Sequence, residues 1–427
     1  MNPQHAGPDE LRWLFLDLNS YFASVEQQLN PALRGKPVAV VAVMTDSTCA
    51  IAASAQAKAF GVSTGTRIGE AKKLCPQLQL VRADHSRYVE YHERVKAEVE
   101  RHFPVEVVAS IDEMGLLLDP PRRSLDAAVD LAHRIKRGLR ANVGECITCS
   151  IGIAPNRYLA KVASDLQKPD GLSILRLADM PGRISHWKLT QLFGIGKRME
   201  PRLSALGITS IEALWEAGPE VLAQAWGGVG GRRFWQQLHG GDIGEFAQHS
   251  RSIGHSHVLS PELRKPPEAL TVARRMLTKA ASRMRREGLC CASLTLSVRG
   301  ESEQRSDVGF RLPAPCKDNF SLMHLLDQAW PKAMDEVHWC RVRKVGVTLN
   351  DLTSADAPEQ LSLFAQADEA DPELKRRRER LSSAMDHINQ RFGRDSIAMG
   401  FLPGEVKEFS GTKIAFSRIP KAEEFQE

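Results

Sequence analysis

Short apolar runs alternate with helically spaced apolar residues along the chain up to about residue 175. Residues 13–16 form one such run, and apolar residues then recur at Phe22, Val25 and Leu29. Apolar residues three or four positions apart predict an amphipathic helix, whereas a short continuous run predicts a buried strand. The same criterion predicts strands at 37–43 and 146–153, a β-hairpin at 105–119, a small helix within 49–62, and helices at 85–101, 124–140 and 156–166. This alternation is typical of an α/β layer.

The rest of the chain has a different pattern. The strand signal is absent from residues 185–245, where two short helices are predicted around the turn at 193–196. Residues 246–256 are polar and rich in His and Ser, which indicates a linker. Alternating strands and helices return in 257–352, and the charged segment 353–427 is expected to be mostly flexible. The sequence therefore predicts several structural modules followed by a tail.

The composition indicates a globular protein. Of the 427 residues, 42% are hydrophobic and 26% are charged, which excludes a disordered, collagenous or fibrous chain. No window reaches the roughly 18 consecutive apolar residues that a membrane span needs, and the first ten residues lack the pattern of a signal peptide. The eight cysteines have no repeated spacing that resembles a disulfide framework. We therefore expect a soluble protein of the cytoplasm without a membrane partner.

Charge is distributed unevenly. The whole chain carries 57 Lys and Arg against 52 Asp and Glu, a net charge of only +5. Residues 251–300, however, hold ten Lys or Arg against three Glu. A local excess of this kind predicts a face that binds a polyanion such as nucleic acid.

Three carboxylates stand at predicted strand ends, namely Asp17, Asp112 and Glu113. Converging carboxylates without a basic neighbour in sequence are suited to a hard divalent cation such as Mg²⁺. Two such ions would clamp the attacking and leaving oxygens of a phosphoryl transfer. The alternative is that acids flank a hairpin only because turns are polar, and the spacing alone does not decide between the two.

A family resemblance favours the metal site. The segments DLNSYFASVE at 17–26 and SIDE at 110–113 resemble the two metal-binding motifs of Y-family translesion DNA polymerases, in the same order and at similar separation. Ser150-Ile-Gly152, Asn156, Lys161, Asp165 and Lys168-Pro169 resemble the stretch that follows the catalytic acids in that family. The resemblance continues to about residue 355 and points to the UmuC/DinB-like bacterial branch.

The resemblance implies roles for residues of both metal-binding motifs. Asp17, Asp112 and Glu113 would be the catalytic metal ligands, with the Leu18 carbonyl as a main-chain ligand, and the cofactor would be two Mg²⁺ ions, for which Mn²⁺ can substitute. Phe22 would be the steric gate that collides with a ribose 2′-OH, although a Phe at this helical spacing is more often an ordinary core residue.

The same resemblance implies a nucleotide site. Lys168 corresponds to the family's triphosphate-binding lysine, and Tyr21 and Lys58 would also contact the incoming nucleotide. The chain departs from one common family pattern by having Ala55 and Lys58 where that pattern has Tyr and Arg, and by having Asn19 in place of a second Asp.

Two further segments resemble DNA-binding elements of the family. Phe193-Gly-Ile-Gly-Lys197 resembles a helix-hairpin-helix turn, whose main-chain N–H groups approach a phosphate. A tight turn between packed helices is the alternative. In the last block the helix at 267–287 is basic and would grip the duplex backbone. The DNA-binding residues predicted in this way are Gly194, Gly196, Lys197, Arg198, Arg275, Lys279 and Arg286.

A short apolar motif stands within the polar tail. Gln360, Leu361, Leu363 and Phe364 look like the clamp-binding motif by which bacterial polymerases bind a sliding clamp. Such a peptide would tether the enzyme by raising its effective concentration. A basic stretch further on, at 373–393, has helical apolar spacing and could dock on the body or on a partner.

The resemblance implies an α+β multidomain fold shaped like a right hand, with a ferredoxin-like palm, small fingers, a helix-hairpin-helix thumb and an α/β little finger. The expected boundaries are 10–31 and 80–178 for the palm, 32–79 for the fingers, 179–246 for the thumb, 247–256 for a linker, 257–355 for the little finger and 356–427 for a flexible tail with the clamp motif.

The function that this resemblance implies is template-directed, low-fidelity DNA synthesis past damaged bases, without proofreading, as part of the SOS response of a bacterium. Its partners would be primer-template DNA, deoxynucleoside triphosphates, the sliding clamp and accessory mutagenesis proteins, near the nucleoid. Two alternatives remain: a catalytically silent subunit that binds DNA and clamp, and a helix-hairpin-helix repair nuclease.

Overall fold

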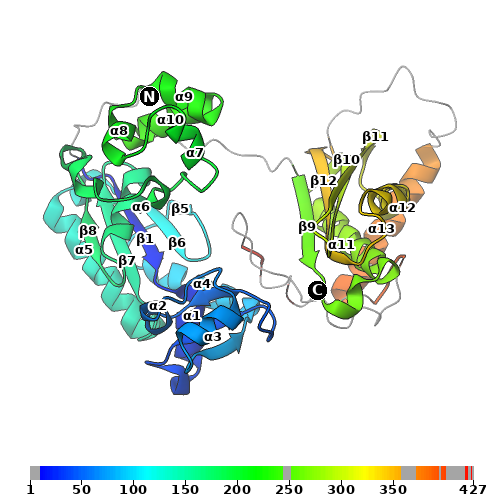
Figure 1. The fold of residues 1–427 in the computed structure, drawn as a ribbon, viewed down its shortest axis with the longest axis horizontal. Helices are drawn as coiled ribbons and strands as arrows, with labels where there is room; N and C mark the ends of the chain where they lie inside the picture. The colour runs from blue at the N-terminus through cyan, green and yellow to red at the C-terminus, as the bar shows by residue number, and fades with distance from the viewer. Residues whose placement is uncertain are drawn as a thin grey trace. The chain divides into compact units, whose positions relative to one another are not determined.

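The computed structural model describes residues 10–243, 252–356, 372–393, 396–400, 419–421 and 425. They belong to two compact units, one formed by Met1–Glu245 with Thr412–Phe425 and the other by Phe246–Gly411 with Gln426–Glu427 (Figure 1). Within the described ranges, no helix combines the length and the apolar character needed to cross a membrane. Each unit has its own β-structure and its own hydrophobic core residues.

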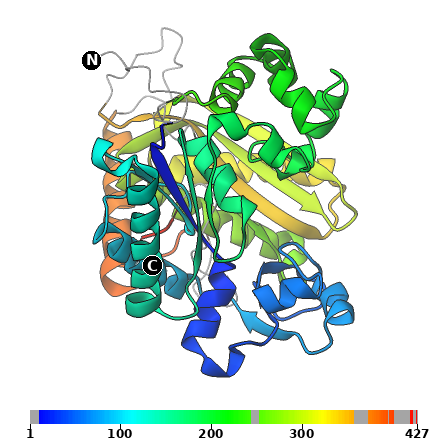
Figure 2. The same ribbon diagram turned by 90° about the vertical axis from the view of Figure 1, so that its left-hand side faces the viewer.

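A five-stranded sheet organises the first unit, in the order β5-β6-β1-β7-β8. Its strands are β1 (Trp13–Leu18), β5 (Val107–Val108), β6 (Glu113–Leu117), β7 (Cys149–Ala154) and β8 (Leu172–Ile174). The central strand β1, dark blue in Figure 2, runs antiparallel to both β6 and β7. All six of its residues are buried because helices cover both faces of the sheet.

The two faces of β1 enter different cores. Leu14, Leu16 and Leu18 pack with residues of α4 (His85–Glu100) and α5 (Leu125–Gly138). Trp13 and Phe15 pack instead with α6 (Arg157–Leu166). Since side chains alternate along a strand, Asp17 shares the α6 face with Trp13 and Phe15.

Close contact between α6 and β7 depends on a glycine. A Cβ atom added at Gly152 would lie 2.0 Å from the Ala160 carbonyl oxygen and 2.3 Å from the Ser164 nitrogen. Only glycine therefore allows the helix backbone to approach the strand this closely. This approach brings the polar face of α6 towards the end of β1.

A smaller sheet of three strands, ordered β3-β2-β4, corrects one expectation. It contains β2 (Val38–Val41), β3 (Ala50–Ala53) and β4 (Gln79–Arg82), with α2 (Ala55–Ala59) and α3 (Ile68–Leu74). The Ala-rich stretch at 49–62 was expected to be one small helix, but its first half is a strand. Pairing of β3 with β2 outweighs the helix propensity of alanine, and the helix begins only after Ser54, whose Oγ accepts the Ala57 N–H.

Helices make up the end of the first unit: α7 (Glu200–Ser204), α8 (Ile211–Glu216), α9 (Pro219–Trp226) and α10 (Val229–Leu238). Their apolar residues share one core with α6 and the α6 face of β1. Asn156, the N-cap of α6, donates to the carbonyl oxygens of Gln237 (2.7 Å) and Gly241 (2.8 Å). The helical module is thus joined to the helix beside Asp17. The first unit also contains helix α1 (Tyr21–Leu29) and a π-helical turn (Leu139–Val143) after α5.

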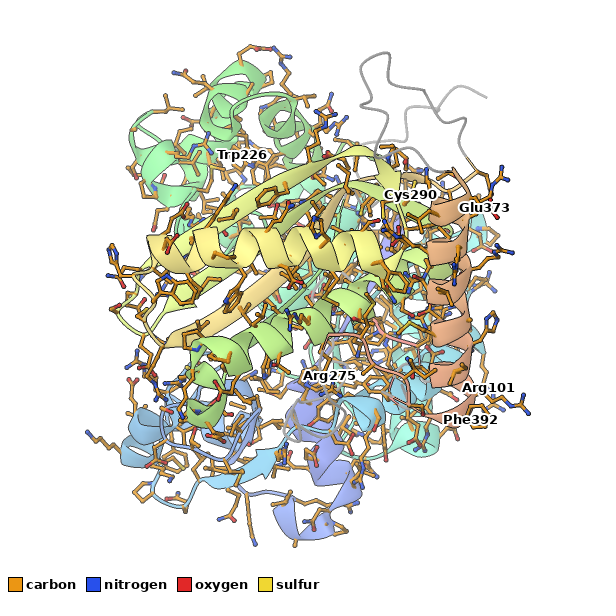
Figure 3. All side chains as sticks on the ribbon, turned by 90° about the vertical axis from the view of Figure 1, so that its right-hand side faces the viewer. Arg101, Trp226, Arg275, Cys290, Glu373 and Phe392 are labelled. Carbon is orange, nitrogen blue, oxygen red and sulfur yellow. The ribbon has the colours of Figure 1, made fainter. Side chains whose placement is uncertain are left out.

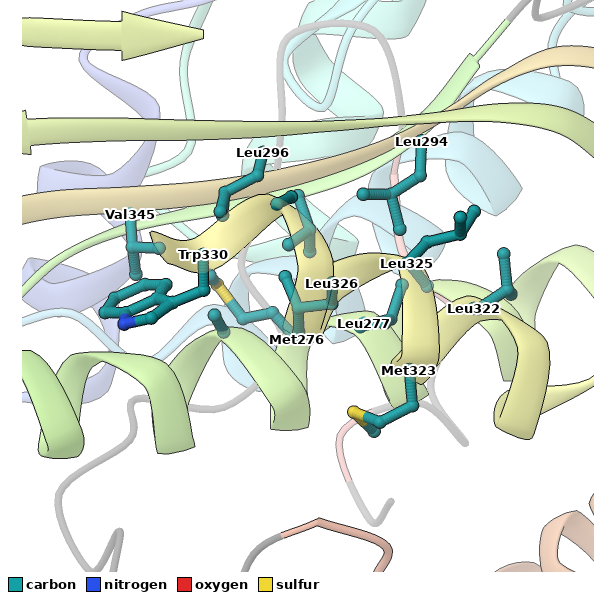
Figure 4. Close-up of a cluster of buried hydrophobic side chains, with 14 of the residues drawn as sticks. Met276, Leu277, Leu294, Leu296, Leu322, Met323, Leu325, Leu326, Trp330 and Val345 are labelled. Carbon is teal, nitrogen blue, oxygen red and sulfur yellow. The ribbon is translucent and has the colours of Figure 1, made fainter. Parts of the chain in front are cut away.

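The second unit is a four-stranded antiparallel sheet, ordered β11-β10-β12-β9, with helices packed against it. The elements are β9 (Ser252–Val258), α11 (Pro266–Arg286), β10 (Leu289–Gly300), β11 (Arg305–Cys316), α12 (Asn319–Glu336) and β12 (Val342–Ser354). Figure 4 shows Leu294, Leu296 and Val345 from the strands meeting apolar residues of α11 and α12. The region was expected to begin at 257 after a linker at 247–256. Residues 252–256 instead belong to β9, because this polar strand gains its partners by pairing with β12.

The expectation of a flexible tail over 356–427 is wrong for α13 (Pro372–Phe392), which packs on the second unit and whose labelled ends are visible in Figure 3. The Arg285 guanidinium donates to both carboxylate oxygens of Asp386, at 2.7 and 2.9 Å. Ser382, fully buried, accepts the Asn319 N–H at 2.9 Å. Polar contacts of this kind hold α13 in place. Its apolar spacing alone did not predict this docking, because most of its residues are polar. The separate expectation of a helix at 373–393 is confirmed.

Candidate active site

Asp17 and Glu113 face each other across neighbouring strands. They are partners in the β1–β6 register, and Asp17 is only 6% exposed. The Lys161 ammonium of α6 donates to Asp17 Oδ2 at 2.5 Å and lies 2.8 Å from Glu113 Oε1. Two acids that are far apart in sequence are thus bridged by one cation.

A second ammonium reaches the same carboxylate. Lys168 Nζ lies 2.7 Å from Asp17 Oδ2 and 2.7 Å from Asp165 Oδ1, and Lys161 is 3.6 Å from the same Asp165 oxygen. Burial disfavours the charged form of Lys161, but the charges of Asp17, Asp165 and Glu113 outweigh this effect and raise its pKa. The site is a compact network of alternating charges.

Asp112 lies beside this network on the loop before β6. Its Oδ1 accepts the Ser110 hydroxyl at 2.5 Å, and its main-chain oxygen accepts the Leu18 N–H at 2.9 Å. Burial raises the pKa of Asp112, and the negative charge of Asp17 raises it further. Burial likewise raises the pKa of Glu113, although Lys161 opposes the shift. Burial and the negative charge of Asp17 therefore both disfavour the charged forms of Asp112 and Glu113.

The donor set fits a hard divalent cation. The side-chain atoms that could bind a metal here are the carboxylate oxygens of the three acids. The Lys161 ammonium already supplies positive charge between Asp17 and Glu113. In the described part of the chain, no three His, Cys, Asp or Glu side chains are already arranged as a metal-binding group. The acids are close enough to share a cation, and the ammonium occupies part of that position.

Lys58 of α2 is electrostatically linked to the same region. Partial burial lowers its pKa, and the positive charge of Lys168 lowers it further, whereas Asp17 acts in the opposite direction. Two neighbouring ammonium groups that repel each other are a suitable site for a multiply charged anion.

Phe22 and Tyr21 have different environments at the start of α1. The Phe22 ring is partly buried and stacks on Tyr88 of α4. Tyr21 is 3% exposed, and its hydroxyl donates to the Tyr88 carbonyl oxygen at 2.6 Å. Tyr21 can therefore offer a ligand its main chain more readily than its hydroxyl.

The predicted DNA-binding residues occupy two places. Gly194, with φ of 92°, and exposed Gly196, Lys197 and Arg198 lie in the turn before α7. On α11, Arg275 is buried at 8% exposure, Lys279 is half-buried and Arg286 is exposed. The turn thus presents basic groups at its surface, whereas Arg275 lies mostly below the surface of its helix. The clamp motif at 360–364 lies outside the described residues.

Sequence reasoning missed the roles of three residues at this site. Lys161 and Asp165 were quoted only as parts of a motif, and Asn19 only as a departure from a family pattern. The spacing of Lys161 and Asp165 at i and i+4 was a usable signal, because it places both side chains on one side of the helix predicted at 156–166. Asn19 had no comparable signal, since its partners come from distant segments.

Two family models match the chain. The impB/mucB/samB family model matches residues 16–165, and the model of the C-terminal domain of that family matches residues 250–363. A DNA polymerase IV of Moorella thermoacetica is 34% identical over 390 residues, which are 89% of this chain and 93% of the relative. The chain belongs to the Y family of DNA polymerases. All three carboxylates of this Y-family chain lie inside the first matched segment.

Other relatives agree. A DNA polymerase IV of Pelotomaculum thermopropionicum is 33% identical over 417 residues, covering 93% of this chain and 98% of the relative. The solved structure of a Y-family DNA polymerase chimera of Dbh and Dpo4 has a TM-score of 0.69 at 22% identity, covering 80% of this chain and 99% of that one. An insertion ternary complex of Dbh DNA polymerase has a TM-score of 0.53 at 22% identity and the same coverage. These structures show that the α+β multidomain fold of the Y family is shared.

Proposed function

We propose that this Y-family enzyme adds deoxynucleotides to a primer at two Mg²⁺ ions held by Asp17, Asp112, Glu113 and the Leu18 carbonyl, with Mn²⁺ able to replace Mg²⁺. The enzyme is a DNA-directed DNA polymerase of the translesion class, as its family membership establishes. The observation that carries the metal proposal is that Asp17 and Glu113 are paired in the strand register and share the Lys161 ammonium. Bound divalent ions would stabilise the charge that develops during phosphoryl transfer.

The lysines of the site would bind the triphosphate. Lys168 is a partly exposed, compact ammonium beside Asp17, and it lies close enough to Lys58 to add to the effect of burial in lowering the pKa of Lys58. An anionic phosphate between the two would relieve their repulsion. Tyr21 and Phe22 would contribute at the uncapped N-terminus of α1, where no side chain accepts the first N–H groups.

Phe22 would select the sugar. Its ring is held against Tyr88 by stacking and flanked by His85, with a ring-centroid distance of 6.1 Å to the latter. A ring fixed in this way would resist displacement by a ribose 2′-OH, which is the property required of a steric gate.

The duplex would be gripped by two surfaces without reading its sequence. Lys197 and Arg198 next to the Gly194–Gly196 turn would contact phosphates, as would the basic residues Arg275, Lys279 and Arg286 of α11. The hand-like division into palm, fingers, thumb and little finger is part of this proposal, with the little finger beginning at Ser252 of β9 instead of at residue 257. The motif Gln360, Leu361, Leu363 and Phe364 would bind a sliding clamp, with accessory mutagenesis proteins as further partners, in the bacterial cytoplasm.

Primer extension tests the metal proposal. The wild-type enzyme should extend a primer on undamaged and lesion-bearing templates in Mg²⁺, and the Asp112→Ala/Glu113→Ala variant should not. Asp119→Asn is the matched control, because this carboxylate follows the same strand region but pairs with Arg122 at 2.6 Å. It should extend normally.

Two outcomes would count against the proposal. Extension that persists in the double variant would show that these acids do not hold the catalytic metals. A folded, DNA-binding wild-type protein that extends no primer, even with a sliding clamp, would favour the catalytically silent subunit.

A further inference from the structure

Asn19 follows β1 directly, and its side chain makes three hydrogen bonds to two other segments of the chain. Its Nδ2 donates to Ser150 Oγ at 2.9 Å, and its Oδ1 accepts the Thr148 hydroxyl at 3.2 Å. The same Oδ1 accepts the main-chain N–H of Asp170 at 2.8 Å. Asn19 is 8% exposed, so water does not readily replace these partners.

The third bond reaches the turn that carries Lys168. Asp170 has a positive φ of 55°, a left-handed conformation that is uncommon for non-glycine residues and that Asp tolerates better than most. From the other side, the Lys136 ammonium donates to the carbonyl oxygens of Asp170 and Gly171, at 2.5 and 3.1 Å. Asn19 and Lys136 therefore hold the turn together at Asp170, two residues after Lys168.

We propose that Asn19 is a positioning residue, which holds the Lys168 ammonium at the triphosphate site by binding the Asp170 N–H. This inference depends on the proposed role of Lys168. Asn19 follows Asp17 by two positions, so it links the turn to the strand that carries a metal-binding acid. Asn19 would thereby hold Lys168, the proposed triphosphate ligand, beside Asp17, the proposed metal ligand, where Lys168 Nζ lies 2.7 Å from Asp17 Oδ2.

The chemistry of the bond predicts which substitutions are tolerated. Asn19→Asp keeps an acceptor for the Asp170 N–H and for Thr148, and the Ser150 hydroxyl can turn to donate instead of accept. Asn19→Leu has a similar size but no acceptor, and it leaves the partly buried Asp170 N–H without its side-chain partner. The proposal therefore requires an acceptor at position 19 rather than an amide.

The experiment measures steady-state nucleotide incorporation and, independently, equilibrium binding of a deoxynucleoside triphosphate to the enzyme on a dideoxy-terminated primer-template. Asn19→Leu should raise both KM and Kd roughly tenfold, the equivalent of about one hydrogen bond, with a smaller fall in kcat. Asn19→Asp should restore values close to those of the wild type. A thermal melt of each variant separates these effects from unfolding, which would lower the fraction of active enzyme without changing KM.

Two controls complete the design. Arg140→Met removes an exposed ion pair to the Asp170 carboxylate but leaves its N–H bond intact, so KM should not change. Lys168→Ala should raise KM at least as much as Asn19→Leu. If Lys168→Ala leaves KM unchanged, the proposed role of Lys168 fails. If Lys168→Ala raises KM and Asn19→Leu does not, or if Asn19→Asp is as impaired as Asn19→Leu, the positioning role is overturned.

Discussion

Phe22 and Tyr88 stack face to face, with ring centroids 4.3 Å apart and planes inclined by 12°. Tyr88 is in turn held by its hydroxyl, which donates to Glu26 Oε1 at 2.6 Å. Both Glu26 and Phe22 belong to α1, one turn apart, so Tyr88 from α4 is fixed at its ring and at its hydroxyl by the same helix. The position of the Phe22 ring is thus set by packing with a distant element.

Phe22→Ala should relax discrimination against ribonucleotides. Removal of the ring leaves room for a 2′-OH, so the preference for a deoxynucleotide over the matching ribonucleotide should fall on the order of 100-fold, as when a pocket gains space for a small group. The measurement is the ratio of kcat/KM for the two triphosphates. Phe60→Ala, at an exposed ring in the same unit, should keep the wild-type ratio. An unchanged ratio in Phe22→Ala would show that another side chain excludes the ribose.

The Tm of the Lys161→Met variant should rise more on addition of a divalent ion than the Tm of the wild type does. Without the ammonium, Glu113 loses its cation and Asp17 keeps only Lys168 to offset the repulsion between the two carboxylates, so the folded state should lose about 3 kcal/mol. A divalent cation binds only the folded arrangement and should restore much of this loss. The measurement is Tm with and without Mg²⁺ or Mn²⁺ in the absence of DNA. Arg134→Met, which removes an exposed cation that pairs with Asp130, is the control. A metal-induced rise in Tm no larger than that of the wild type would contradict the prediction.

Gly152→Ala should separate α6 from the sheet. The added methyl group would overlap the backbone of α6, and overpacking of this kind costs about 1–3 kcal/mol or more of the free energy of unfolding. Lys161 would move with the helix, so polymerase activity should fall as well. Gly182→Ala introduces the same methyl group where no atom lies within 4 Å and should be neutral in denaturant unfolding. Equal free energies of unfolding for the two variants would show that α6 can move away from the sheet without loss of stability.

Glu98 should make stability depend on acid pH. Burial alone would raise its pKa, but hydrogen bonds from Asn142, His102 and Arg101 outweigh burial and lower the pKa. The unfolded state then binds the proton of Glu98 more tightly than the folded state does. The contribution of Glu98 to the free energy of unfolding is therefore present above the unfolded pKa, about 4.3, and is lost as the pH falls through the lower folded-state pKa. Glu98→Gln should therefore flatten the decline of the unfolding free energy with falling pH in this range.

The control for Glu98 comes from the same helix. Glu100→Gln removes an exposed carboxylate whose partner, Lys96, lies 3.8 Å away, and it should keep the wild-type pH dependence. The free energy of unfolding from urea titrations at a series of pH values distinguishes the two variants. A Glu98→Gln profile that parallels the wild type would place the acid sensitivity elsewhere.

Elements with local signals were predicted well. The apolar run of β1 and the helical patterns of α4, α6 and α11 are all properties of a few neighbouring residues, and the structure has each element close to its expected range. The motifs around Asp17 and Asp112 were also visible, because the family pattern is carried by consecutive residues. Their roles as ligands remain proposals.

Other features depended on contacts between distant segments. The strand β3 forms in an Ala-rich stretch because β2 pairs with it, β9 forms from polar residues because β12 supplies its hydrogen bonds, and α13 docks through Arg285 and Asp386. The placement of Lys161 and Lys168 on Asp17, and of Asn19 on Asp170, likewise follows from β-strand register and from the close approach that Gly152 permits. Local patterns record the preferences of neighbouring residues for helix or strand, but the partner of a buried charge or of an edge strand is chosen only when the folded chain brings remote groups together.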